Sequence, residues 1–167
     1  MIYRRLVNQH LSSAQLILTE LAHQTSAGDS LQGAFEHSAL HLLNSAYLCQ
    51  LRAIAENYHC SDIAAISAIE TLQAALVAID KPAPEAREIE VLASEGWLAG
   101  LLIAQQQLCL PASSQTPEQV MPSTSQSDIA LRDDSSEQSI LNATKLRQWL
   151  LALEELVQRQ GEMMVEY

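Results

Sequence analysis

Histidines and the carboxylates near them are the residues whose spacing could bind a metal ion in this sequence. Helical metal sites commonly combine two Glu-x-x-His pairs with one carboxylate from each of two further helices. One such pair is Glu20 and His23. At 100° per residue, His23 lies almost opposite the apolar face centred on Ala14, and Glu20 lies about 120° from it. We therefore predict that both side chains face water rather than bind a metal.

His37 and His41 stand four residues apart, a spacing that lets two imidazoles bind one metal ion from one face of a helix. Both fall on the narrow polar side of a segment that is apolar over most of its circumference. No third ligand is obvious nearby in sequence, although Glu36 or a histidine from another helix would complete a site. The pattern favours surface histidines, with a metal site as the alternative.

His10 differs from the other histidines because it falls within about 40° of the apolar face of the first predicted helix. A histidine in such a place must find a hydrogen-bond partner or shift its pKa and stay neutral. We interpret it as a satisfied histidine at the edge of the core, with a ligand or proton-transfer role as the alternative. No Ser/His/Asp or Cys/His catalytic pattern accompanies it, so we predict no catalytic residue and no cofactor.

The three cysteines, Cys49, Cys60 and Cys109, are an odd number at wide spacings. No CxxC or Cys/His ligand pattern connects them. They are expected to be small buried hydrophobic residues.

The charge balance of the 167 residues is acidic, with 9 Lys+Arg against 20 Asp+Glu and a formal net charge of −11. Scattered cations argue against direct binding of nucleic acid or of an anionic membrane, because both need clustered positive charge. The longest apolar stretch, 96–104, is too short for the roughly 20 residues that cross a bilayer. Near the N-terminus, polar residues interrupt the apolar core that a signal peptide would need, so export by that route is not expected. The expected location is the cytoplasm.

The positions of the prolines divide the chain into long segments in which helices can form, because proline disrupts a helix interior. Apolar residues recur in these segments at three- and four-residue steps, and no strand-like alternation is present. We predict one all-α domain, an up-down helical bundle of four to five helices, with a long acidic Ser/Pro-rich loop at about 110–135 before the last helix. The predicted helices span about 3–25, 31–58, 62–79, 85–109 and 137–163.

Details of this bundle follow from single residues. The second helix is apolar so widely that we place it at the centre. Ser61 or Cys60 is the expected N-cap of the third helix. Gly96 and Gly100 allow a close helix approach on one strip of the fourth, either within the chain or as a dimer seam. The long loop lets the last helix reach a distant groove of the same bundle or dock on a second subunit.

Three short motifs resemble those of a family of short, all-helical bacterial proteins of unknown function. They are Asn8-Gln-x-Leu, the end of the second helix from Ala55 to His59, and Trp97-Leu-Ala. The resemblance covers about the first 110 residues, carries no catalytic residue, and implies an all-helical fold in a bacterial, cytosolic setting.

The functional expectation is a non-enzymatic bundle that binds another protein, in the manner of an adaptor, chaperone or inhibitor. The alternative is a metal- or small-ligand-binding bundle that uses His10, His23, His37 and His41. A homodimer through the last helix or the glycine strip is a further alternative.

Overall fold

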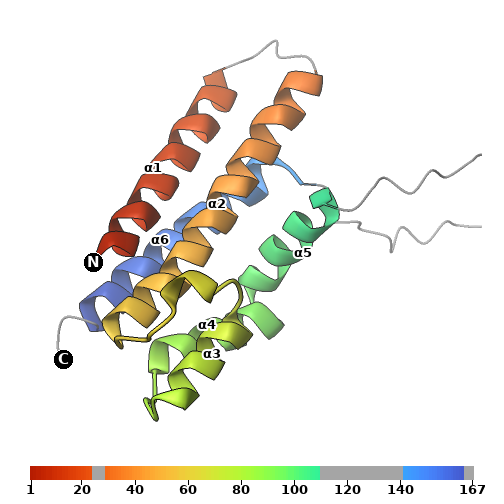
Figure 1. Ribbon diagram of the computed structural model, residues 1–167. Coiled ribbons are helices and arrows are strands. Elements are labelled where there is room, and N and C mark those ends of the chain that lie inside the picture. The colour runs from red at the N-terminus through yellow and green to blue at the C-terminus, as the bar shows by residue number, and fades with distance from the viewer. Residues whose placement is uncertain (24–28, 110–140, 164–167) are drawn as a thin grey trace, which may run out of the picture.

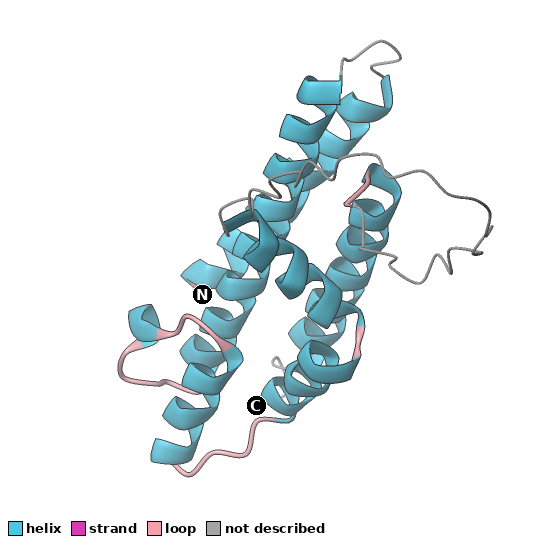
Figure 2. Ribbon diagram, turned by 90° about the vertical axis from the view of Figure 1, so that its right-hand side faces the viewer, coloured by secondary structure: helices cyan, strands magenta, loops and turns pink. Residues whose placement is uncertain are grey.

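The computed structural model describes residues 1–23, 29–109 and 141–163. These ranges fold entirely into helices and connecting turns, with no strand among them, so the all-α prediction is confirmed (Figures 1 and 2). The predicted loop at about 110–135 lies outside the described residues. The elements are α1 (Ile2–His23), α2 (Asp29–Asn57), the 3-10 helix η1 (Ile63–Ala65), α3 (Ile69–Ala78), α4 (Pro84–Glu95), α5 (Trp97–Cys109) and α6 (Ala143–Met163).

α2 lies at the centre of the molecule and contacts each of the other five α-helices. Its wide apolar arc explains this position, because neighbours on several sides bury Leu40, Leu43, Leu51 and Ile54 completely. Figure 1 shows α1 beside α2, with α6 behind them and the shorter helices α3, α4 and α5 at the opposite side of α2.

α1 runs antiparallel to α2, and a side chain from the far end of α2 caps the first turn of α1. The carboxylate of Glu56, near the end of α2, accepts hydrogen bonds from the backbone N–H groups of Ile2 at 3.0 Å and Tyr3 at 3.3 Å. The first N–H groups of a helix have no partner within the helix, so this carboxylate supplies one. The ends of the two helices are thereby held together.

The single helix expected at 62–79 is two separate elements, η1 and α3. Asp62 caps η1 by accepting from the N–H of Ala65 at 3.3 Å, and Ala68 is extended with φ −157° and ψ 168°. The hydroxyl of Thr71 then accepts from the N–H of Ala68 at 3.1 Å. The expectation that Ser61 or Cys60 caps the helix is wrong, because local side-chain bonds compete with the helix over these residues.

The helix expected at 85–109 is likewise divided, into α4 and α5, at Gly96. Gly96 has φ −102° and ψ −169°, and a Cβ built there would lie 2.9 Å from both the Cα and the carbonyl oxygen of Leu92. Gly100 lies inside α5, where its Cβ position is 3.3 Å from the Trp149 ring of α6. The two glycines therefore do not form one strip on a continuous helix, and Gly100 serves close packing within the chain.

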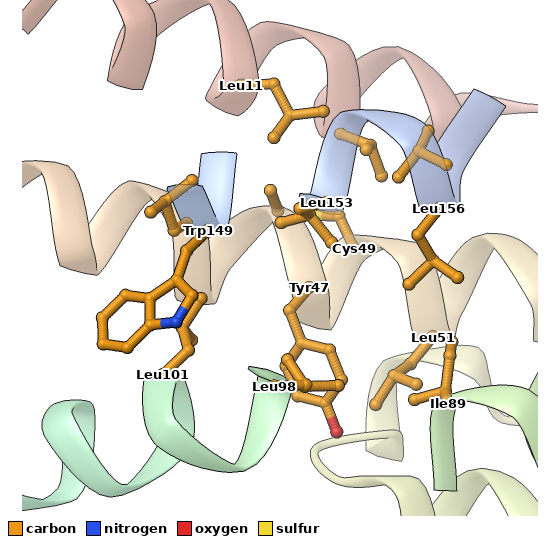
Figure 3. Close-up of a cluster of buried hydrophobic side chains, with 14 of the residues drawn as sticks. Leu11, Tyr47, Cys49, Leu51, Ile89, Leu98, Leu101, Trp149, Leu153 and Leu156 are labelled. Atoms are coloured by element: carbon orange, nitrogen blue, oxygen red, sulfur yellow. The ribbon is translucent and has the colours of Figure 1, made fainter. Parts of the chain in front are cut away.

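α6 begins at Ala143 rather than near 137 and packs against α1, α2 and α5 of the same chain. It runs antiparallel to α1, since Arg147 donates to the carbonyl oxygen of Leu18 at 2.9 Å and Gly161 lies beside Arg4. Figure 3 shows the ring of Trp149 against Leu101 of α5, and Leu153 and Leu156 directed towards α2. Of the two predicted locations for the last helix, the groove within the same bundle is the one observed. The buried residues of its apolar stripe are Leu146, Trp149, Leu150, Leu153, Leu156 and Val157.

Two helices end at a residue with left-handed backbone that is not glycine. His59 after α2 has φ 58°, and Asp80 after α3 has φ 52°. At the first, the N–H of Cys60 donates to the carbonyl of Ala55 at 2.9 Å, and the N–H of His59 donates to Glu56 at 3.2 Å. The turn after α3 repeats this pair of hydrogen bonds, which is the Schellman arrangement that glycine ordinarily completes.

Candidate functional site

The four histidines considered as metal ligands are distributed over two helices. His10 is partly buried on α1, His23 is exposed at its last turn, and His37 and His41 are exposed on α2. Throughout the described ranges, no three His, Cys, Asp or Glu side chains lie close enough together, as they stand, to hold a metal ion. Glu20 and His23 both face outward on α1.

His37 and His41 nevertheless share a surface hollow with residues of α5. The hollow has a volume of about 670 Å³. Its lining residues are His37, Ser38, His41, Leu42, Gln105, Leu108 and Cys109. Cys109, the last residue of α5, is exposed, so the prediction of a buried cysteine is wrong there. A helix end leaves its side chains fewer neighbours than a helix centre, which accounts for the exposure.

Gln105 is the residue that connects the two helices inside this hollow. Its Nε2 atom lies 3.4 Å from Nδ1 of His41 and 3.8 Å from Sγ of Cys109. Its Oε1 atom is buried and has no hydrogen-bond partner among the described residues. A buried amide oxygen without a hydrogen-bond partner is uncommon and costs stability. Among the described residues, Oε1 of Gln105 is the one buried side-chain oxygen or nitrogen atom in this condition.

Cys49 and Cys60 are buried in the core, as predicted, and neither lies in a pocket described here. Burial raises the pKa of both thiols, and Arg52 partly opposes that rise at Cys49. Tyr47 is also a core residue, and Figure 3 shows its ring beside Leu98. Burial, with a smaller contribution from the negative charge of Glu70, raises the pKa of Tyr47 to about 12. These shifts belong to packed side chains rather than to a reactive cleft.

A buried polar network joins α2, α4 and α6. Gln50 donates to the side-chain oxygen of Gln160 at 2.9 Å. Gln160 in turn donates to the carbonyl of Glu85 at 3.2 Å and to Oε2 of Glu88 at 2.9 Å. Tyr58 donates from its hydroxyl to the buried Glu85 carboxylate at 2.9 Å, and Arg159 pairs with Glu88. Since the amide of Gln160 uses its acceptor and both donor hydrogens, the network fixes packing and leaves Gln160 no group to offer a ligand.

A shallow groove follows the outer side of the antiparallel pair α1 and α6. It consists of two successive hollows of about 340 and 200 Å³. The first is lined by Arg4, Asn8, Leu11, Ser12, Glu154, Val157 and Gln158, and the second by Gln15, Leu18, Thr19, Arg147, Leu150 and Leu151. Leu151 is 65% exposed in this groove. Leu16, which is 70% exposed, lines neither hollow and lies on the outer face of α1, one helical turn from the lining residues Ser12 and Thr19.

The comparison with known families decides the assignment of the chain. A model of a family of unknown function, DUF6586, matches residues 1–167. The chain belongs to the DUF6586 family. The match extends beyond the first 110 residues and includes the residues of α6 as well as those of α1 to α5. No curated protein and no solved structure matches the chain.

The contact of Gln105 with His41 and Cys109 in this DUF6586 protein escapes sequence reasoning, whereas the burial of Gln160 does not. Gln105 and Cys109 stand far from His41 in sequence, and a glutamine in the run 105–107 carries no ligand signal. The buried Gln160 was open to detection, because it follows Val157 by three residues and continues the apolar stripe of α6.

None of the described helices combines the length and apolarity required to cross a membrane.

Proposed function

We propose that this DUF6586 protein is a non-enzymatic module that binds another protein, and that the groove between α1 and α6 is its docking surface. The carrying observation is that Leu151, 65% exposed, lines the groove on α6, while Leu16, 70% exposed, lies on α1 one helical turn from the lining residues Ser12 and Thr19. Large apolar side chains gathered beside a groove, rather than scattered singly, are typical of interaction surfaces.

The groove has the form that an added helix requires. α1, α2 and α6 pack on one another, and α1 and α6 are antiparallel neighbours whose outer side contacts none of the described helices. A helix laid between α1 and α6 would complete a four-helix arrangement and bury Leu16 and Leu151. Binding of an amphipathic helix in a groove is a common mode of peptide recognition.

The charge of the groove supports a partner helix with acidic flanking residues. Arg4 and Arg147 line it against one acid, Glu154, in a chain whose formal net charge is −11. A partner helix with an apolar stripe and acidic flanking residues therefore matches this surface better than a basic one. The acidic remainder of the molecule would repel such a helix from other faces.

The non-enzymatic part of the proposal is supported by where the titratable groups lie. The residues with raised pKa values, Tyr47, Cys49 and Cys60, are core side chains. Catalytic groups are instead expected in a cleft, with perturbed pKa values and a partner that positions them.

The test compares capture of a partner by two double variants. Leu16→Ser/Leu151→Ser removes the exposed leucines at and beside the groove, and Val77→Ser/Val91→Ser removes comparably exposed side chains from α3 and α4. We expect a stoichiometric partner in native lysate to bind the wild type and the α3/α4 variant, and to be lost from the groove variant. Equal retention by both variants, or no stoichiometric partner for the wild type, would overturn the proposal.

A further inference from the structure

We propose that the groove between α1 and α6 selects a partner helix whose charged residues follow the order acid, base, acid at seven-residue steps. This inference rests on the docking surface proposed above and names the sequence pattern that the surface recognises. It is drawn from three half-buried charged side chains that line the groove, Arg4, Glu154 and Arg147.

The residues that line the groove repeat with a period of seven on both helices. Arg4, Leu11 and Leu18 lie seven residues apart on α1, and Arg147 and Glu154 lie seven residues apart on α6. Seven residues make nearly two helical turns, so these residues lie on one face of each helix. Helices with such a repeat pack side by side by inserting side chains into matching holes. The groove therefore fits a helix that has a seven-residue apolar repeat of its own.

The three charges are evenly spaced along the groove, in the order positive, negative, positive. At one end Arg147 donates to the carbonyl oxygen of Leu18 at 2.9 Å, and at the other end Arg4 lies beside Gly161. Glu154 is seven residues from Arg147 and seven from Gly161, so it stands midway between the two arginines. At 1.5 Å per residue each step is about 10 Å, and a docked helix meets all three charges over about 21 Å.

None of these three charges has an ionic partner among the residues that the structure describes. Arg147 donates to a neutral backbone carbonyl, and Arg4 and Glu154 line the same hollow without pairing. Docking removes half-buried charges further from water, which costs free energy unless an opposite charge meets each of them. A helix in the groove therefore needs an acid beside each arginine and a base beside Glu154.

A second copy of this chain does not supply the required pattern. None of the nine Lys and Arg residues in the sequence has an acid seven residues away on both sides. Arg87, for example, has Asp80 on one side and Ser94 on the other. The occupant that satisfies the groove is therefore a helix of a different protein. The pattern reads the same in both directions, so helices of either direction satisfy the charges.

The experiment measures binding of the full chain to three synthetic amphipathic peptides of about 21 residues, or three heptads. A staple on the face away from the groove keeps each peptide helical. The peptides share one leucine stripe and differ only at three positions seven residues apart, which hold Glu-Lys-Glu, Gln-Gln-Gln or Lys-Glu-Lys. By fluorescence anisotropy, we expect Glu-Lys-Glu to bind about tenfold more tightly than Gln-Gln-Gln, and Lys-Glu-Lys to bind most weakly.

A charge reversal in the centre of the groove tests the order directly. Glu154→Lys should bind a Glu-Glu-Glu peptide more tightly than Glu-Lys-Glu. Glu155→Lys is the matched control, because it makes the same change on an exposed side chain of α6 that lines neither hollow, and it should keep the preference of the wild type. Unfolding temperatures close to that of the wild type verify that both variants fold.

The inference is overturned if the wild type binds none of the peptides or binds all three equally, or if Glu155→Lys changes the preference as much as Glu154→Lys. The two proposals fail separately. Equal binding of the three peptides that is weakened in Leu16→Ser/Leu151→Ser would show that the groove holds a helix and that only the charge order is wrong. Binding of Glu-Lys-Glu that is unchanged in that variant would show that the helix lies elsewhere, and both proposals would fall.

Discussion

The side chain of Gln50 on α2 donates a buried hydrogen bond of 2.9 Å to the side chain of Gln160 on α6, 110 residues further along the chain. This bond sets the position of α6 along α2, because a shift of either helix would leave buried amide groups without partners. An apolar interface alone specifies the relative position of two helices only weakly, since leucine side chains still pack after a small shift. The groove between α1 and α6 depends on that position.

Gln160→Ala is expected to destabilise the fold by about 2–3 kcal/mol, because it leaves the donor of Gln50 and the acceptors of Glu85 and Glu88 without their partner. Urea unfolding measures the loss. Gln158→Ala, an exposed change two residues earlier on α6, serves as the control and should cost far less. Equal midpoints for the two variants would show that the network does not stabilise the fold.

Gly96→Ala should cost about 1–3 kcal/mol, since its Cβ would lie 2.9 Å from backbone atoms of Leu92 that cannot move aside easily. Gly100→Ala should change stability by less than about 1 kcal/mol, because the gain in helix propensity offsets the tight 3.3 Å contact with Trp149. Thermal unfolding of both variants tests this order. The account of the break at Gly96 fails if Gly100→Ala is the more damaging change.

His59→Gly and Asp80→Gly should each raise the free energy of unfolding by about 0.5–1 kcal/mol, because glycine adopts the left-handed backbone without steric cost. His59→Ala is the matched control, since it removes the imidazole and keeps the Cβ. Chemical denaturation distinguishes them: if His59→Ala stabilises as much as His59→Gly, the imidazole rather than the backbone carries the cost.

The stability of the protein should fall as the pH rises from about 10 to about 12. Burial, and then the charge of Glu70, raise the pKa of Tyr47 from 10.0 to about 12 in the folded state. Below pH 10 the phenol is neutral in both states, whereas above it the unfolded chain loses a proton that the folded chain keeps. Urea midpoints at several alkaline pH values should therefore decline less steeply for Tyr47→Phe than for the wild type. Parallel declines would contradict this.

Periodic apolar residues predict the helices well and their interruptions poorly. The stripe of α6 and the wide arc of α2 are visible because burial imposes a repeat of three and four residues. The breaks at Ala68 and Gly96 depend on a hydroxyl bond from Thr71 and on backbone crowding at Leu92, which leave the apolar repeat unchanged.

The candidate sites were predictable only in part. The spacing of His37 and His41 singles out one face of α2, but Gln105 reaches His41 across 64 residues through packing that no local pattern encodes. The groove requires knowing that α6 docks on α1 within the same chain, and the sequence left a second subunit open as the alternative.

The most direct measurement of the proposed function places a photoreactive amino acid at Leu151 of the groove, and in a second protein at Val77 of α3. Irradiation in native lysate should give one discrete adduct from position 151, to a protein other than a second 18.3 kDa copy, and none from position 77. Mapping of the adduct should place the linkage in an amphipathic helix with acidic flanks. Identical adducts from both positions, a self-adduct alone, or no adduct from position 151 would contradict the account.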